Sequence, residues 1–557
     1  MRICFSFTFL FILFYSITFA QSNASNDSIA GHKKILDKTG EVAAWYKPEI
    51  PGAAFSHVAK LASEFIKNTP PVDPKTGMPL YYLSCCFSGP HIVGKEAFEK
   101  GQSPSNWLNN PACIFAGMVQ SLVAGYMVYS GDSSYISIVR KMLDYQIENG
   151  TTPAGWPWAN VPYASADPGE TIYRGSVRWV KENMRGEGLH GIEPDKVGEL
   201  GNAYLIFYEV TLEDKYLQAA IHCADALAAN VRDVIPRGST TQEFSISKSP
   251  WPFRVNAQTD IVISDYCSNV IEPIKLFDEL LRLKIRLNLP EQKVVAYNKA
   301  RTLAWKWLFS KAGPIVTGVW SGYFEDIQND PGLANRNQVS PMETARYLIK
   351  HPELDPNIKK TVPYLLNMVS TVFRTDGLKA IKEQTWCYDP MGSHTARYAS
   401  VCALWYEYTK DPYWKKEAFD FFNVATYMTD ENGVVRVGPT WAGSWFSDGY
   451  GDYIRHFLEG LHAIPEWAND GKDHLLGSSS IVKSVQYSPS TIVYKIFDDI
   501  AVEKLKMEKK PKSVTVNGKK INEKNNPGQE GWQWEKATKG GVLYVHHSSG
   551  TEIVINK

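Results

Sequence analysis

The stretch SHTARYAS brings together three side chains that can hold or transfer a proton. His394, Arg397 and Tyr398 stand at positions i, i+3 and i+4, which share one face of a helix. Ser393 follows the breakers of DPMG and is expected to cap that helix, because its hydroxyl can accept from the free amides of the first turn. A base, a guanidinium and a phenol placed together can carry out acid–base chemistry. The alternative is that they only pack the start of a helix.

Polar and ionisable residues also stand at the starts of four further helical patterns. They are His190, Glu193 and Glu199; Tyr266 and Asn269; Glu343 and Arg346; and Asp448, Tyr450 and Asp452. Where such helices run side by side, their first turns lie at one end. We therefore expect all of these residues around a common rim.

Three short segments indicate how these helices are connected. YSGDSSY (129–135), VTLEDKY (210–216) and YTKDPYW (408–414) share Ser or Thr second, Asp or Glu fourth and an aromatic residue seventh. Each lies between an apolar helical pattern and an amphipathic one, and the acid suits the amide dipoles at the start of the second helix. The segments predict helix–turn–helix hairpins.

Extending this register along the chain gives six hairpins. The apolar first helices, at 111–130, 195–211, 265–285, 340–351, 393–409 and 449–463, are expected to be buried on all sides. The partner helices fall at 133–148, 214–230, 290–311, 355–374 and 412–428, and the segment 54–68 can supply the sixth. Six inner and six outer helices predict an (α/α)6 toroid, with an open helical array as the alternative.

The connections from outer to inner helices are long and rich in aromatic residues. They carry Trp156, Trp158, Trp320, Trp441 and Trp445. Long loops in compact domains usually carry function, so these rings are candidates for stacking on sugar faces. The alternative is that the loops bury their own aromatic side chains.

The two ends of the chain differ from this helical region. Residues 1–20 have the pattern of a secretory signal peptide cut after Ala20, which predicts a periplasmic or secreted protein and leaves no membrane span in the mature chain; a membrane anchor is the alternative.

The toroid is expected to fill 21–475. From 476 to 557 the apolar pattern has period two and Asn517-Gly518 marks a tight hairpin, which predicts a small, non-catalytic antiparallel β-sandwich. Its pair His546-His547 is expected to be solvated.

Composition excludes several classes of function. The chain has 59 basic and 59 acidic residues, so nothing favours binding to nucleic acid. The seven cysteines left after cleavage are scattered and show neither a disulfide framework nor zinc-ligand spacing. No phosphate-binding glycine loop, metalloprotease helix or nucleophile elbow is present in the sequence. We expect no cofactor and no metal, although bound Ca²⁺ in the acidic loops is left open. The oligomeric state is also left open by the sequence.

The six hairpins with the D-x-x-Y turn, the Trp-rich loops and the β-sandwich tail resemble the α/α-toroid carbohydrate-active enzymes. That grouping includes polysaccharide lyases, unsaturated-glucuronyl hydrolases and related uronic-acid enzymes. The resemblance spans nearly all of the mature chain but is architectural, so no residue is carried over from a single family. It implies an enzyme that acts on an acidic polysaccharide or oligosaccharide and leaves the reaction open.

The residue types at the rim narrowly favour β-elimination at a uronic acid. The reaction needs a cation or amide on the carboxylate, a base at C5 and an acid for the oxygen leaving C4. The candidates are Arg397, Arg346 and Asn269 for the carboxylate, His394 and His190 for the base, and Tyr398 and Tyr450 for the acid. The leaving oxygen can belong to the next sugar, as in a polysaccharide lyase, or to a free hydroxyl at a chain end, as in a dehydratase.

Two other functions fit parts of the sequence. Glycoside hydrolysis needs two carboxyl groups across the scissile bond, and Glu193, Glu199, Glu325, Asp326, Asp448 and Asp452 supply candidates. Acidic residues at helix starts are also expected for capping alone, so this signal is less specific. A non-catalytic glycan-binding protein is the third reading.

Overall fold

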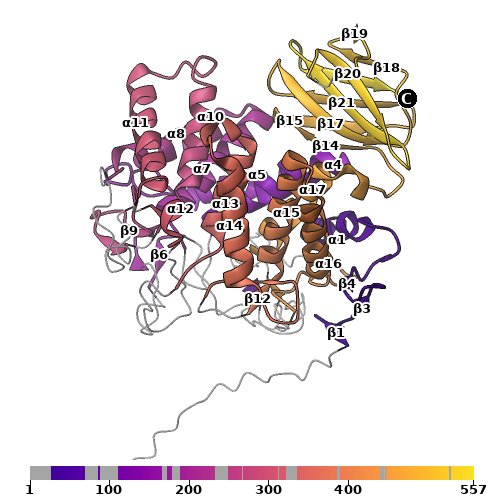
Figure 1. Ribbon diagram of the computed structural model, residues 1–557. Helices are drawn as coiled ribbons and strands as arrows, with labels where there is room; N and C mark the ends of the chain where they lie inside the picture. The colour runs from indigo at the N-terminus through magenta and orange to yellow at the C-terminus, as the bar shows by residue number, and fades with distance from the viewer. Residues whose placement is uncertain are drawn as a thin grey trace, which may run out of the picture.

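The computed structural model describes residues 27–68, 86–87, 111–165, 172–177, 188–232, 249–265, 267–311, 313–320, 335–385, 389–439, 444–445, 448–525 and 528–557. The predicted signal peptide lies outside these residues. Within them, helices form a ring and a two-sheet domain follows, so the predicted fold class, an (α/α)6 toroid with a C-terminal β-sandwich, is confirmed (Figure 1).

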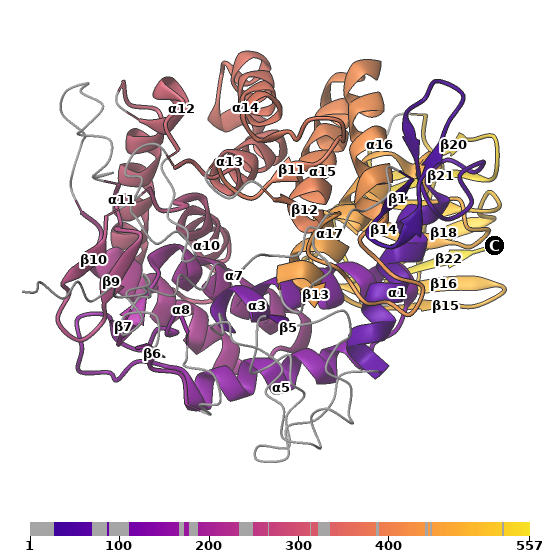
Figure 2. The same cartoon turned by 90° about the horizontal axis from the view of Figure 1, so that it is seen from below.

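In the described residues, six helical segments form the inner layer of the ring, which Figure 2 shows from below. They are α3-η2-α4 (Pro111–Met118, Val119–Tyr126 and Met127–Ser130), α7 (Pro194–Thr211), α10 (Ile271–Arg282), α13 (Val339–Lys350), α15 (Gly392–Thr409) and α17 (Asp448–Ala463). The first is long and apolar enough to cross a membrane over Ala112–Ser130, but 78% of its most apolar window is buried. It is therefore a core helix of this ring.

The outer layer pairs with the inner one in the predicted order. Its helices are α1 (Ala53–Asn68), α5 (Ser134–Asn149), α8 (Asp214–Ala229), α11 (Glu291–Leu308), α14 (Ile358–Phe373) and α16 (Pro412–Thr426). The N-terminal helix α1 packs against both α16 and α17, so the segment predicted to supply the sixth partner does close the ring.

The three sequence repeats are the turns between inner and outer helices. The third residue of each, Gly131, Leu212 and Lys410, has a left-handed backbone with φ of 82°, 61° and 61°, and its amide closes the inner helix. The Ser or Thr in second place accepts a hydrogen bond from the amide of the acidic residue two positions later. The aromatic seventh residue is buried in each turn. The repeat therefore encodes a helix end, a turn and a hydrophobic anchor.

Short elements complete the helical region. They are the helices α12 (Pro314–Thr317), η4 (Pro352–Leu354) and η5 (Pro465–Trp467) and the strands β1 (Ser28–Ile29), β2 (His32–Lys33), β3 (Ile35–Leu36), β4 (Val42–Ala43), β5 (Cys86–Phe87), β6 (Gly175–Ser176), β7 (Gly188–Leu189), β8 (Gly191–Ile192), β9 (Arg254–Asn256), β10 (Val262–Ser264), β11 (Ile381–Lys382), β12 (Pro390–Met391) and β13 (Ser444–Trp445). Most precede an inner helix, and β8, β9 and β10 form one antiparallel sheet in the order β10-β9-β8.

The C-terminal domain consists of two antiparallel sheets. One contains β14 (His474–Ser478), β17 (Ala501–Met507), β21 (Gly541–His547) and β20 (Gly531–Lys536), in that order. The other contains β15 (Val482–Tyr487), β16 (Thr491–Ile496), β22 (Glu552–Asn556), β18 (Ser513–Val516) and β19 (Lys519–Ile521). Asn517-Gly518 joins β18 to β19 with φ of 46° and 76°, the backbone that a tight two-residue hairpin requires.

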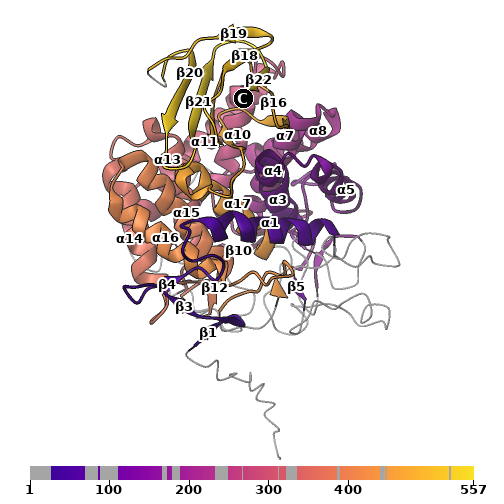
Figure 3. The ribbon, with the colours of Figure 1, turned by 90° about the vertical axis from the view of Figure 1, so that its right-hand side faces the viewer.

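The sandwich lies against the end of the ring where the inner helices finish (Figures 1 and 3). His474 Nδ1 bonds to the carbonyl of Tyr129 at 2.8 Å and the two rings stack. Lys504 pairs with Glu407 at the end of α15. The start of every inner helix is at the opposite end, which we call the mouth.

The expectation that the pair His546-His547 is solvated is wrong for His547. Its side chain is buried between the sheets, with Nε2 3.3 Å from the carboxylate of the equally buried Glu503. Pairing with Glu503 outweighs the cost of burial and raises the pKa of His547.

Candidate active site

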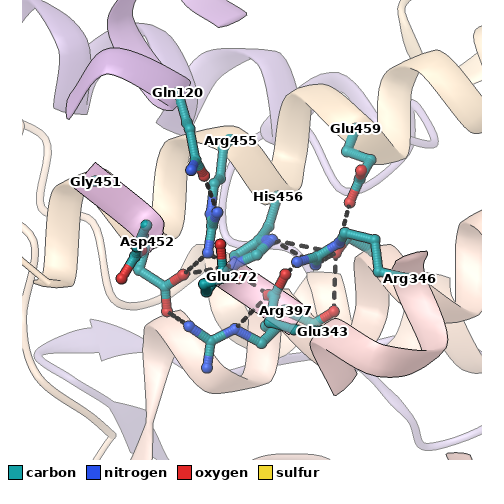
Figure 4. Close-up of polar contacts among 12 residues, drawn as sticks. Gln120, Glu272, Glu343, Arg346, Arg397, Gly451, Asp452, Arg455, His456 and Glu459 are labelled. Atoms are coloured by element: carbon teal, nitrogen blue, oxygen red, sulfur yellow. Dashed lines mark hydrogen bonds and ion pairs between the residues drawn. The ribbon is translucent and has the colours of Figure 1, made fainter. Parts of the chain in front are cut away.

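Ionisable side chains from five inner helices meet inside the ring, from the mouth into the second halves of α13 and α17. Figure 4 shows members from α10, α13, α15 and α17. This group, the mouth cluster, comprises Asp195, Lys196, Glu199, Glu272, Lys275, Glu343, Arg346, His394, Arg397, Asp452, Arg455, His456 and Glu459. Charged groups are costly to bury unless they are paired. In this cluster α7, α10, α13 and α17 each contribute both a carboxyl group and a cation, and α15 contributes Arg397.

Glu343 on α13 is the carboxylate with the most cationic neighbours. It pairs with Arg346 one turn further along, and Lys275 Nζ lies 3.2 Å, Arg397 Nε 3.4 Å and Arg455 Nη2 3.6 Å from its oxygens. Burial opposes ionisation, but these four cations outweigh it and hold the pKa of Glu343 well below its usual value. Glu343 is therefore ionised and joins four helices electrostatically.

Asp452 on α17 is a shared hydrogen-bond acceptor for three neighbouring side chains. It pairs with Arg397, and its other oxygen accepts from Arg455 at 2.5 Å and from His456 Nε2 at 3.1 Å. Burial is again outweighed, here by Arg397 and Arg455, and the pKa of Asp452 is well below normal.

His394 lies in this cluster as a neutral imidazole. Its Nδ1 is 3.2 Å from Arg397 Nη1 and 3.9 Å from Asp452. A guanidinium can only donate, so we assign the lone pair to Nδ1 and the proton to Nε2. Burial first, and Arg397 second, lower the pKa of His394 to about 3.

Two carboxyl groups in the cluster have pKa values displaced upward. Burial, reinforced by Glu193 and Glu199, raises the pKa of Asp195 to about 7. Burial also raises the pKa of Glu272, with Glu199 and Glu343 adding to the shift, although Lys275 donates to it at 2.7 Å. Neighbouring carboxyl groups with pKa values displaced in opposite directions are the usual arrangement of a general acid and a general base.

The structure does not bring the predicted tyrosines into this site. Tyr398 points outward between α15 and α16, where its hydroxyl donates to Glu417 at 3.2 Å and its ring packs on Phe421. Tyr450 is buried, and its hydroxyl donates to the carbonyl of Gly433 and accepts from the amide of Val435. Burial raises the pKa of both phenols well above the usual value, so neither is placed to protonate a leaving group.

The two predicted carboxylate-binding arginines differ in depth. Arg397 lies beside His394, whereas Arg346 donates to Glu459 at 2.9 Å and to Ser400 at 2.8 Å, further from the helix starts. Ser393 does not cap α15, because the helix already begins at Gly392 and no side-chain cap is formed there. Asn269 is buried just before α10 and its Oδ1 has no hydrogen-bond partner.

His190 is at the rim, in the turn between β7 and β8. It has a positive φ of 64°, which is uncommon for residues other than glycine. Its Nδ1 is 3.0 Å from Gln258 Oε1, and its ring contacts that of Trp156 with centroids 4.6 Å apart. His190 and Trp156 are partly exposed, so they remain candidates for contact with a ligand.

The other predicted tryptophans are placed differently. Trp158 is buried and donates to Asp260 at 2.8 Å, and Trp320 is also buried, so neither ring can stack on a sugar. For these two the alternative, a loop that buries its own aromatic residue, is correct. Trp441 lies outside the described residues, as do Tyr266, Glu325 and Asp326, and Trp445 is described only by the pairing of β13 with β5.

Sequence reasoning missed several members of the cluster. Asp452 was a candidate, but Arg455, His456 and Glu459, which follow it at i+3, i+4 and i+7 in DYIRHFLEG, were not. Together they form a polar face on a helix expected to be buried. That pattern could have identified them, because a polar stripe on a core helix must find partners inside the fold. Glu272 and Lys275 in EPIK are a shorter case of the same pattern.

In the described parts of the chain, no three His, Cys, Asp or Glu side chains are grouped as metal ligands.

Comparison with known proteins provides independent support for the fold. No family model and no curated protein matches this chain. Two solved structures superpose with a TM-score of 0.50: cellobiose 2-epimerase from Spirochaeta thermophila, at 10% identity over 74% of this chain and 96% of its own, and a D-mannose isomerase, at 11% identity over 74% and 97%. The likeness establishes the toroid.

Proposed function

We propose that the protein is a carbohydrate-active enzyme that catalyses β-elimination on glycans containing uronic acid. The observation that carries this proposal is the position of His394, a neutral imidazole held 3.2 Å from Arg397 inside a cluster of paired cations and carboxylates. Abstraction of a proton next to a carboxylate requires both a neutral base and positive charge for that carboxylate. The folds with a TM-score of 0.50 are named as a sugar epimerase and a sugar isomerase, which is compatible with a sugar ligand.

His394 is the proposed base. Its pKa is low because it is buried beside Arg397. A substrate carboxylate brings negative charge into the cluster and raises that pKa. His394 then takes the C5 proton, and the C5–H electron pair forms the C4–C5 double bond.

Glu272 is the proposed acid in place of the tyrosines. Burial raises its pKa, and its Oε2, which has no hydrogen-bond partner, is the oxygen that can carry a proton. As the C4–O bond breaks, Glu272 protonates the departing oxygen. The same proton transfers serve chain cleavage and the loss of a terminal hydroxyl, and export from the cytoplasm, as the N-terminal pattern predicts, suits either reaction.

Glycoside hydrolysis is the second candidate. It is favoured by the carboxyl groups with opposite pKa shifts, Asp195 and Glu272 raised and Glu343 and Asp452 lowered. Hydrolysis requires one carboxylic acid and one carboxylate across the scissile bond, and this cluster contains both.

The products distinguish the two reactions. Purified protein is incubated with a panel of uronic-acid polysaccharides and oligosaccharides while ultraviolet absorbance, reducing ends and product mass are followed. Elimination gives an unsaturated uronate that absorbs in the ultraviolet, with chain cleavage or with loss of one water. Consumption of a substrate with new reducing ends and no gain in absorbance would instead support hydrolysis.

A further inference from the structure

The cations of the mouth cluster differ in the exposure of their side chains. The side chains of Arg397 and Arg346 are 6% and 7% exposed, whereas those of Arg455 and Lys275 are each 17% and that of Lys196 is 22% exposed. The two arginines expected from sequence to bind a carboxylate are thus the two most deeply buried. Arg455 is the arginine of this cluster that a ligand in the ring can approach most readily.

Arg455 is also held in place from the neighbouring helix. Its Nη1 donates to Oε1 of Gln120, and its Nη2 donates to Asp452 and lies 3.6 Å from Glu343 (Figure 4). Gln120 takes no charge from Arg455, because its side chain is neutral. It fixes the direction of the guanidinium without neutralising its charge, and an anionic ligand competes for that charge with Asp452.

The segment that carries Gln120 is a π-helix, η2, a form that is rare and is often found at functional sites. Its next residue, Ser121, donates to the carbonyl of Gly451 at 2.6 Å and accepts from the amide of Arg455 at 3.0 Å. Gly117 and Gly451 bring the two backbones into contact, since a Cβ on either would lie about 3 Å from the other helix. The π-helix therefore sets both the register of α17 and the aim of Arg455.

We propose that Arg455, aimed by Gln120, is the residue that binds the carboxylate of the substrate, with Lys275 on the other side of Glu343. Lys275 Nζ is 3.2 Å from Glu343, so both cations reach the same region. This inference rests on the proposed function for the class of ligand, a sugar that carries a carboxylate. Gln120 is a positioning residue, because it acts through Arg455.

The arrangement also connects binding to the proposed base. Asp452 is shared by Arg455 and Arg397, and Arg397 bonds to His394. A substrate carboxylate on Arg455 competes with Asp452 for that guanidinium. Asp452 is then free to pair fully with Arg397, which draws Arg397 from Nδ1 of His394.

Calorimetric titration with two probes, methyl glucuronoside and methyl glucoside, tests this inference without relying on turnover. Wild type is expected to bind the acidic probe more tightly. Arg455→Lys should weaken its binding by about tenfold, because one charged hydrogen bond is worth about that much, and Gln120→Ala by a few-fold. Binding of the neutral probe should be unchanged. The matched controls are Arg282→Lys at the opposite end of α10 and Gln533→Ala in the sandwich, with folding checked by circular dichroism.

The outcomes separate this inference from the proposed function. If acidic and neutral probes bind wild type equally or not at all, or if Gln120→Ala and Arg455→Lys bind the acidic probe as wild type does, the assignment of Arg455 is wrong. If binding of the acidic probe depends on Arg455 and Gln120 but no uronate is ever converted to an unsaturated product, the carboxylate site stands and elimination fails.

Discussion

The two ends of the ring bury charge in different ways. Under the sandwich, ion pairs lie at the junction of ring and sandwich, such as those of Lys504 with Glu407 and of the 40% exposed Arg282 with Glu209, Glu279 and Asp498. At the mouth, Glu343 is shared by four cations and Asp452 by two arginines and two histidines, all of them largely enclosed. Pairs at the junction fix how ring and sandwich assemble, whereas charges enclosed at the mouth can exchange partners when a ligand enters.

The pKa values of buried groups also differ between the mouth and the interior of the sandwich. At the mouth, the pKa of Asp195 is raised to about 7 and those of His394 and His456 are lowered to about 3. In the sandwich, His547 has a single carboxylate partner and a raised pKa. Displacements in both directions within one cluster are typical of active sites. We therefore expect changes at the mouth to affect turnover and changes at the other end to affect stability.

The largest expected effect is that of His394→Gln. The amide can still accept from Arg397, so the cluster keeps its hydrogen bond, but it cannot take a proton. Turnover should fall by about two to four powers of ten, the usual contribution of a general base, with little change in melting temperature. A parallel loss of stability and activity, with normal turnover per folded molecule, would assign His394 to packing.

Lys504→Met should show the reverse. It removes the partner of Glu407 at the junction of ring and sandwich, and a broken charged hydrogen bond of this kind costs about 2 kcal/mol in the free energy of unfolding. Denaturant unfolding measures the loss. Turnover per folded molecule should match wild type, and a selective loss of turnover would contradict the division between the two ends.

Two buried histidines should affect the pH dependence of stability with opposite sign. His456 at the mouth has a folded pKa of about 3, below the unfolded value of 6.5. Its contribution to the free energy of unfolding is therefore present above pH 6.5. That contribution is lost as pH falls toward 3, by about 1.4 kcal/mol per pH unit. His547 has a raised pKa, so its contribution is present below pH 6.5 and is lost as pH rises through the folded value.

The measurement compares unfolding free energies of wild type with His456→Gln and His547→Gln across this range. The difference in unfolding free energy between wild type and variant should shrink as pH falls for His456→Gln and as pH rises for His547→Gln. The same slope for both variants would mean that the two environments are alike.

The smallest expected effect is that of Tyr398→Phe. Its hydroxyl donates to Glu417 between two helices, so its removal should cost about 1 kcal/mol of stability and leave turnover unchanged. Turnover assays and thermal unfolding of the same preparation measure the two quantities. A large loss of turnover would restore Tyr398 to the mechanism.

The ring could be predicted from sequence because its signals are local. The repeats at 129–135, 210–216 and 408–414 encode a helix end, a left-handed turn residue and a buried aromatic anchor, and each works within seven residues. Apolar periodicity then assigns inner and outer helices. The position of the inner-helix starts at one end of the ring could be predicted because long connections precede them.

The site was predicted only in part, because its members are defined by neighbours distant in sequence. His394 and Arg397 lie one turn apart and were found, but rotation along the same helix turns Tyr398 outward toward α16. Arg455 is adjacent to nothing polar except His456 in the chain, and its role depends on the π-helix that carries Gln120. Side-chain direction on a buried helix depends on packing, which spacing alone does not reveal.

The most direct test of the central claim follows one deuterium atom. A uronic-acid oligosaccharide labelled at C5 is incubated with wild type and with His394→Gln, and the product mass and absorbance are measured. Proton abstraction at the mouth predicts an ultraviolet-absorbing product that has lost the C5 deuterium, formed far more slowly by His394→Gln. A product that retains the C5 deuterium, or equal rates for the two proteins, would contradict the account.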